Sequence, residues 1–219
     1  MTVKKRGVKS ILGEAAMLGV CIIFFIPFYY LVNTFKPARE ATVSPLSLPV
    51  KSFTLDLYRQ ALNTINFWSS FRNSILITVV SVVIIISIGS MASYAISRRK
   101  NKLTQFLFFY FLIGFMVPVQ TTLIPLFTLM SFLKLQNSVA GMIVLYSSWC
   151  NFAMFMYQGF LGGVPKDLEE AALIDGANLW KLFWWIVFPL LKPVTTTIVI
   201  FDVMWIWNDF MLPYLFTSS

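Results

Sequence analysis

The stretch ILITVVSVVIIISIGSMASYAI, residues 75–96, decides the fold class of this chain. It contains no charged residue, and about 20 apolar residues are enough for a helix to cross the hydrocarbon core of a bilayer. Its many Val and Ile residues also suit a β-strand, but strands usually have only about 3–10 residues. Backbone groups in lipid must pair within their own segment. The stretch therefore predicts a transmembrane helix.

The rest of the chain has the same character. Of its 219 residues, 58% are hydrophobic and 12% are charged, whereas about 25% are charged in a typical soluble domain. A soluble fold of this size would not bury so much apolar surface and still present a polar exterior. Four more segments are long and apolar enough to span, at residues 13–32, 103–126, 139–160 and 194–216. We therefore expect an all-α polytopic membrane protein with about five transmembrane helices.

The basic residues predict how the chain is oriented, because Lys and Arg are enriched in cytoplasmic loops. They concentrate in the N-terminal tail, in the loop 97–102 and in the loop 162–193. This pattern places the N-terminus in the cytoplasm and the long loop 34–74, with a short helix at 55–62, outside. The predicted division is a cytoplasmic tail at 1–12 and a transmembrane domain at 13–216 that contains the cytoplasmic loop 162–193. Because no small-residue cleavage site follows the first apolar run, we interpret it as a retained span rather than a signal peptide.

Composition also disfavours several functions. The net charge is +8, but the basic residues flank apolar segments, so it indicates topology rather than nucleic-acid binding. The chain has no His, and Cys21 and Cys150 lie in apolar runs, so we expect no catalytic residue, metal site or cofactor. It has no G-x-x-x-x-G-K-[ST] motif. We therefore expect a protein that is not an enzyme and that leaves ATP to another chain.

The loop 162–193 has a pattern of its own. Pro165 suits the start of a helix, since its fixed φ fits the first turn. Three acidic residues follow and suit the positive end of the helix dipole: Asp167, Glu169 and Glu170. Gly176 then interrupts the run, and Asn178 is a plausible cap for a second, aromatic helix at 179–188. We interpret the loop as two short helices joined by a glycine bend on the inner membrane surface, although composition alone also allows a solvated loop with an interfacial anchor.

The same loop resembles the EAA loop of ATP-binding-cassette (ABC) importer permeases. The matching residues are Glu170, Ala171, Ala172, Gly176 after three residues, Ile186 after nine more, and then Phe188 and Pro189. The family usually has Leu at the position of Phe188. The fuller string EEAALIDGANLWKLFWWIVFPLLKP, residues 169–193, is similar to the carbohydrate branch, the class of the smaller maltose permease subunit. Stretches at 52–62, 73–74, 118–127 and 207–216 agree, so the resemblance covers nearly the whole chain.

The resemblance implies a permease subunit of an ATP-driven, binding-protein-dependent importer that carries a sugar or sugar derivative across the bacterial cytoplasmic membrane. The implied partners are two cytoplasmic ATP-binding subunits, which bind the ATP, an extracytoplasmic solute-binding protein, membrane lipid, and a second permease subunit that the branch favours as a different chain. The implied coupling residues are Glu170, Ala171, Ala172, Asp175 and Gly176. Family members usually continue through a sixth span, so we expect this chain to lack the last helix of the pattern.

Polar residues within the spans are candidates for the solute path. Asp202 lies about 12 Å into its span, where a carboxylate costs about 2.5–3.5 kcal/mol on insertion scales and must face protein or water. It either lines the path, pairs with a partner subunit or makes a hydrogen-bonded packing contact. The path candidates are Asp202, Trp205, Asn208 and Asp209, with weaker ones at Gln120, Asn151, Gln158 and Trp207.

Three other interpretations remain open at this point. An ABC permease for a polyamine, peptide or oxyanion would show the same loop. A secondary transporter or channel would explain the spans and Asp202 but does not predict the EAA pattern. A polytopic membrane enzyme is disfavoured by the absence of His and of clustered acids.

Overall fold

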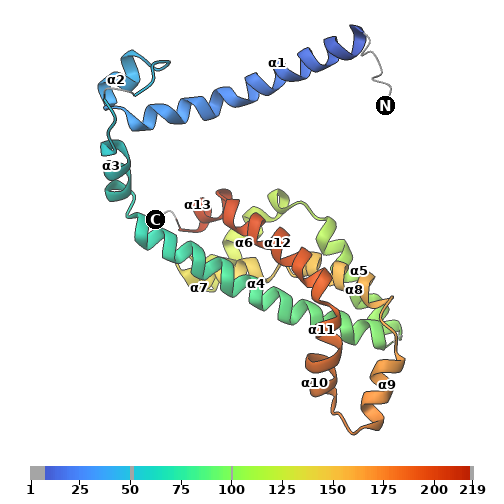
Figure 1. The fold of residues 1–219 in the computed structure, drawn as a ribbon. Coiled ribbons are helices and arrows are strands. Elements are labelled where there is room, and N and C mark those ends of the chain that lie inside the picture. The colour runs from blue at the N-terminus through green and yellow to red at the C-terminus, as the bar shows by residue number, and fades with distance from the viewer. Residues whose placement is uncertain (1–7, 50–51, 100, 218–219) are drawn as a thin grey trace. The chain divides into compact units, whose positions relative to one another are not determined.

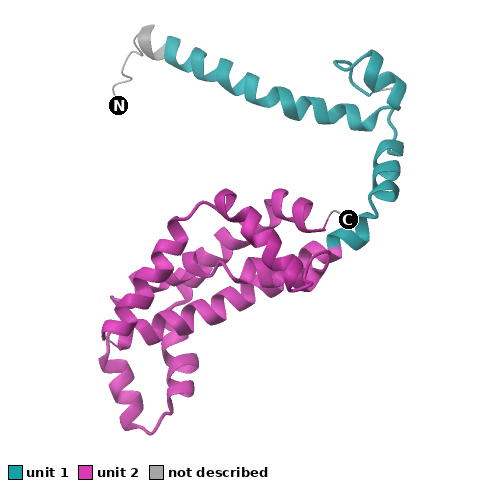
Figure 2. Ribbon diagram, turned by 180° about the vertical axis from the view of Figure 1, so that it is seen from behind, with its two compact units in different colours: residues 1–71 teal, residues 72–219 magenta. Residues whose placement is uncertain are grey.

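The computed structural model describes residues 8–49, 52–99 and 101–217. These residues form helices joined by turns and bends, with no strand among them, which confirms the all-α prediction (Figure 1). The chain divides into two compact units, residues 1–71 and 72–219 (Figure 2). Residues 1–7 of the predicted N-terminal tail lie outside the described part of the chain.

The first unit carries one long helix and most of the predicted outer loop 34–74. Its elements are α1 (Val8–Tyr30), a 3-10 turn (Leu31–Phe35), α2 (Ala38–Val43) and α3 (Asp56–Thr64). The helix α3 confirms the short helix expected at 55–62. No residue of the apolar window in the span Leu12–Phe35 is buried, so its whole circumference is available to lipid or to other helices.

The second unit holds the remaining helices around one apolar core. They are α4 (Phe67–Arg98), whose first turn belongs to the first unit, α5 (Lys102–Met116), α6 (Val119–Phe132), α7 (Val139–Ser147), α8 (Asn151–Leu161), α9 (Asp167–Ile174), α10 (Leu179–Lys181), a π-helix (Leu182–Val187), α11 (Phe188–Leu190), α12 (Lys192–Asn208) and α13 (Met211–Thr217). Large side chains from α4, α7, α8 and α12 fill the core, among them Ile85, Tyr146, Tyr157 and Ile198.

The described helices satisfy the prediction of about five spans only if bent pairs are counted. Three helical segments are long and apolar enough to cross a bilayer: Leu12–Phe35, Phe67–Arg98 and Val139–Leu161. The last of them, the fourth predicted span, consists of α7 and α8 with a turn at residues 148–150 between them. Two more candidates are pairs of helices, bent by 103° between α5 and α6 and by 76° between Leu179–Leu190 and α12. The total is therefore three, or up to five with each bent pair taken as one span.

The third predicted span, 103–126, was wrong as a continuous helix. The helix α5 ends at Met116, and α6 begins at Val119 in a new direction. Pro118 explains the break, because its ring disfavours helical geometry at the preceding residue. Val117 accordingly has an extended backbone, with ψ 120°.

The fifth predicted span, 194–216, also required correction. The helix α12 ends at Asn208, and α13 is a separate short helix. Asp209 separates them, since its Oδ1 accepts hydrogen bonds from the backbone N–H groups of Met211 (3.0 Å) and Leu212 (3.4 Å). A carboxylate that satisfies these otherwise unpaired N–H groups favours the start of a new helix over continuation of the old one.

Candidate functional site

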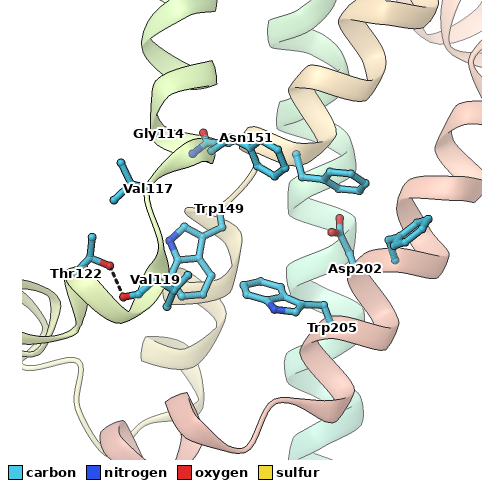
Figure 3. A pocket seen from close by; sticks show the side chains of 11 residues that line it. Gly114, Val117, Val119, Thr122, Trp149, Asn151, Asp202 and Trp205 are labelled. Atoms are coloured by element: carbon cyan, nitrogen blue, oxygen red, sulfur yellow. Dashed lines mark hydrogen bonds between the residues drawn. The ribbon is translucent and has the colours of Figure 1, made fainter.

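A cavity of about 390 Å³ lies among α5, α6, α8 and α12 (Figure 3). Its lining is mainly aromatic and apolar, with a few polar groups: Gly114, Phe115, Val117, Val119, Thr122, Trp149, Asn151, Phe152, Phe201, Asp202 and Trp205. Small-molecule sites have volumes of about 300–1,000 Å³ and the same mixture of apolar walls and few polar groups. The cavity therefore has the size and chemistry of a site for a small solute.

The cavity lies deep along the helices that form it. At 1.5 Å per residue, Gly114 is about 18 Å along α5 from its first residue, and Asp202 is about 15 Å along α12. Half of a bilayer core is about 15 Å. Irregular backbone borders the cavity at Val117 and at Trp149. Such backbone is tolerated at membrane depth only where protein buries it or where it lines a cavity, which gives both helix breaks a physical reason.

Asp202 is the charged group of this cavity. Its side chain is 7% exposed, and its Oδ2 has no hydrogen-bond partner among the described residues. Figure 3 shows the carboxylate beside the aromatic rings of the cavity. The rings of Trp149 and Trp205 lie 5.0 Å apart, and those of Phe152 and Phe201 lie 5.8 Å apart. The arrangement suits a ligand that has an apolar face for the rings and a hydrogen-bond donor for the carboxylate.

The structure separates the four predicted path residues into two pairs. Asp202 and Trp205 line the cavity, whereas Asn208 and Asp209 do not. Asn208 donates from Nδ2 to the carbonyl of Met204 in its own helix (2.7 Å). Asp209 caps α13 and accepts a hydrogen bond from the buried Tyr146 hydroxyl (2.8 Å).

The weaker path candidates are also divided. Asn151 lines the cavity, at the start of α8. Gln158 lines a second, much smaller cavity, and Gln120 is exposed. Sequence reasoning missed the contribution of Trp149, although an indole in the middle of an apolar span was a usable signal.

The loop between α8 and α12 forms a separate site at one end of the second unit (Figure 1). The helix α9 ends in a Schellman motif, in which the N–H of Gly176 bonds to the carbonyl of Leu173 (3.1 Å) and the N–H of Ala177 to that of Ala172 (3.0 Å). Gly176 has φ +84°, the left-handed conformation that glycine adopts without strain. Asn178 then caps the next helix, accepting from the N–H of Lys181 (2.8 Å).

The second helix of the loop departs from the regular helix expected at 179–188. Its middle, Leu182–Val187, is a π-helix, and the N–H of Phe188 bonds to the carbonyl of Phe183. Pro189 gives the reason, because a proline has no N–H to donate and its ring clashes with the carbonyl four residues earlier. A wider turn relieves that clash, and π-turns of this kind are frequent at functional sites.

The predicted coupling residues occupy two faces of the loop. Ala172 is buried within the chain, whereas four others are exposed: Glu170, Ala171, Asp175 and Gly176. Beside them, Leu168 and Leu173 are each 47% exposed and Ile174 is 85% exposed. The exposed side of α9 therefore combines carboxylates, among them Glu170, with several large apolar side chains.

The inner face of α9 carries an ionic contact that the sequence did not predict. Glu169 is buried and pairs with Arg98, the last residue of α4, whose Nε lies 2.7 Å from Oε1. The hydroxyl of Tyr94 donates to the other oxygen of Glu169 (2.8 Å). Tyr94 and Arg98 are four residues apart and so share a helix face, but nothing in the sequence identifies the acid that meets them.

Residues 85–219 match the family described as binding-protein-dependent transport system inner membrane component. The chain belongs to this family. The permease is 39% identical over 199 residues, 89% of its length and 71% of the relative's, to the probable starch degradation products transport system permease protein AmyC of Thermoanaerobacterium thermosulfurigenes. It is 34% identical over 202 residues, 91% and 73% of the two lengths, to the melibiose/raffinose/stachyose import permease protein MelC of Bacillus subtilis.

The fold agrees with a solved member of the ABC importers. A chain in the crystal structure of a bacterial ABC transporter involved in the import of the acidic polysaccharide alginate matches with a TM-score of 0.83 and 23% identity, covering 100% of the permease and 78% of that chain. The permease is thus an inner-membrane transport component and not an enzyme. Its family implies ATP-binding subunits and a solute-binding protein as partners.

Proposed function

We propose that the permease carries a sugar or sugar derivative across the cytoplasmic membrane, driven by ATP that a separate subunit hydrolyses. In this proposal the complex contains two ATP-binding subunits, one of which docks on the loop between α8 and α12, and a second, different permease subunit completes the path. A solute-binding protein delivers the solute from outside. Because the ATP-binding subunits are cytoplasmic, the loop must face the cytoplasm, and the predicted topology places the N-terminus on the same side.

The solute class follows from the cavity and from the relatives. AmyC and MelC are named for starch degradation products and for melibiose, raffinose and stachyose. A sugar ring has an apolar face for the indoles of Trp149 and Trp205 and hydroxyl donors for the carboxylate of Asp202. The same carboxylate would repel an oxyanion, which makes an anionic solute the weaker choice.

The observation that carries the coupling proposal is the outer face of α9. Glu170 stands beside Ala171, Leu173 and Ile174, and all four are exposed. A cluster of exposed apolar residues at the end of a loop is typical of a protein interaction site. The carboxylate of Glu170 adds a contact for a basic residue of the partner.

Charge reversal at Glu170 tests this docking. In a complex purified through the tagged permease, Glu170→Arg is expected to reduce the amount of co-purified ATP-binding subunit at least about tenfold, since truncating or reversing a close charge pair costs several kcal/mol. Asp56→Arg makes the same change at an exposed residue of α3, in the predicted outer loop, and should retain the subunit. Equal retention by both variants would refute docking through Glu170.

A transport assay separates the rival functions. Proteoliposomes that contain the whole complex and its binding protein are expected to take up labelled raffinose or maltotriose only with internal ATP, and to do so in the presence of a protonophore. Uptake that needs a proton gradient instead would indicate a secondary transporter. Uptake of putrescine with neither sugar transported would indicate a polyamine permease.

A further inference from the structure

We propose that Tyr94, Arg98 and Glu169 form a clamp that makes α9 move as one body with the inner ends of α4 and α8. The clamp is the part of the permease that turns a push on α9 into a displacement of the cavity wall. This inference rests on the proposed docking of an ATP-binding subunit on α9, but it concerns residues on the opposite, buried face of that helix.

Arg98 connects three segments at once. Its Nη2 lies 2.5 Å from Oε1 of Glu169 in α9. Its Nη1 donates to the carbonyl of Leu161 (3.4 Å), the last residue of α8, and its Nη2 donates to the carbonyl of Val164 (3.3 Å) in the connection to α9. A planar guanidinium with five donors can hold several acceptors in fixed directions, which an ammonium group cannot. The side chains of Arg98 and Glu169 are only 15% and 10% exposed, so water screens their attraction weakly.

Tyr94 extends the clamp to the second half of the loop. Its hydroxyl binds Glu169, and its ring lies 5.4 Å from the ring of Phe183 in the π-helix. The guanidinium of Arg98 lies 5.9 Å from the centre of the same tyrosine ring. Both helices of the loop are therefore fastened to the same turn of α4.

From the clamp, close packing leads to the cavity. Next to Tyr94, near the C-terminal end of α4, the Ser93 hydroxyl donates to the carbonyl of Met154 in α8 (3.0 Å). One turn further, a Cβ on Gly89 would lie 3.1 Å from the Cβ of Ala153, so the two helices touch closely there. The next residues of α8 towards its N-terminus, Phe152 and Asn151, line the cavity. A displacement of α9 is thus transmitted along packed side chains to the solute site.

The adjacent acids Glu169 and Glu170 accordingly have different tasks. Glu170 is exposed and faces the partner, whereas Glu169 is buried and faces α4. Glu169 is a positioning residue: its loss should leave the docking face in place and weaken only the transmission of movement.

The first test measures uptake per ATP hydrolysed in proteoliposomes, with labelled raffinose as the probe. Glu169→Gln keeps the shape of the side chain and removes its charge. We expect unchanged co-purification of the ATP-binding subunit and about a fivefold fall in raffinose transported per ATP. Arg98→Gln should fall at least as far as Glu169→Gln, because Arg98 also holds the carbonyls of Leu161 and Val164. The double variant should fall no further than Arg98→Gln, because both single variants already remove the same ion pair. Tyr94→Phe, which removes only the hydroxyl, should cause a smaller fall.

Two variants near the clamp serve as controls, and the outcomes that would contradict the clamp differ from the one that would contradict the proposed function. Arg99→Gln and Asp167→Asn change exposed charges next to the clamp and should transport normally. An unchanged uptake per ATP in Glu169→Gln, a loss of uptake that only follows loss of assembled complex, or additive losses in the double variant would each overturn the clamp. Wild-type complex that lacks ATP-driven uptake would contradict the proposed function instead.

A distance measurement tests the clamp without any solute. Spin labels are placed on Arg99→Cys beside α4 and on Lys166→Cys at the start of α9, in a background of Cys21→Ser and Cys150→Ala; both labelled positions are exposed. The label–label distance should be narrow and equal in the nucleotide-free and vanadate-trapped complexes, and should broaden in Glu169→Gln. A distance that differs between the two nucleotide states of the wild type would show that α9 moves relative to α4 and would overturn the proposal.

Discussion

Glu169 and Asp202 are both buried carboxylates, but their surroundings are opposite. Glu169 has a guanidinium and a phenol within hydrogen-bonding distance. Asp202 stands among aromatic rings, and its Oδ2 has no partner within the described residues. A buried charge is stabilised only when it is paired and hydrogen-bonded. The comparison teaches that the fully paired acid holds helices together, while the incompletely paired acid is available to something that enters the cavity.

The largest loss of stability is expected when Glu169, the paired acid, is replaced. Glu169→Leu leaves the Arg98 charge buried without its acid, and breaking such a pair costs about 3–5 kcal/mol. Asp202→Leu removes a carboxylate with no cationic partner and should not destabilise the fold, because its desolvation cost disappears with it. Thermal unfolding of the purified variants in detergent measures both. Equal losses would show that Asp202 is also a structural anchor.

An intermediate effect is expected at the end of α9, where the backbone rather than a charge is tested. Gly176→Val places a β-branched residue at φ +84°, which costs about 1–2 kcal/mol, although nothing within 4 Å would meet the new Cβ. Membrane insertion should be normal and ATP-driven uptake reduced.

Gly176→Asn is the matched variant, since Asn tolerates the left-handed conformation at a helix end. It should keep more uptake than Gly176→Val. Unchanged uptake in the valine variant would refute a role for this bend in coupling.

The smallest change in stability is expected at Asp202, the acid that has no cationic partner among the described residues. Asp202→Asn keeps the size of the side chain and should alter the free energy of unfolding by less than about 0.5 kcal/mol, as for substitutions outside key contacts. Sugar uptake should fall about tenfold, because a hydrogen bond to a charged group is worth about 1.5–3 kcal/mol. Thr196→Ala, an exposed position on the same helix, is the control. Normal uptake in Asp202→Asn would exclude the carboxylate from the path.

The loop 162–193 shows which structural features local sequence patterns can predict and which they cannot. The bend at Gly176 and the cap at Asn178 were predicted from single residues, and the structure has both. Pro165 was expected in the first turn of the helix but lies before its N-cap, Lys166. The wider π-turn was not predicted, although Pro189 was its visible cause. The pairing of Arg98 with Glu169 was beyond sequence reasoning, and Arg98 was interpreted only as a topology signal.

By itself the sequence determined that the chain is helical, that it belongs in a membrane and that it carries a patterned loop before α12. These properties depend on hydrophobicity, capping and backbone preference, which act between residues a few positions apart. Only the tertiary structure decided that the third predicted span breaks around a cavity, that Asp209 caps a helix and that Glu169 faces inward. Arg98 and Glu169 are 71 positions apart, and no local preference acts over that separation. Their contact exists because the packing of α4 against α8 brings both to the same end of the unit.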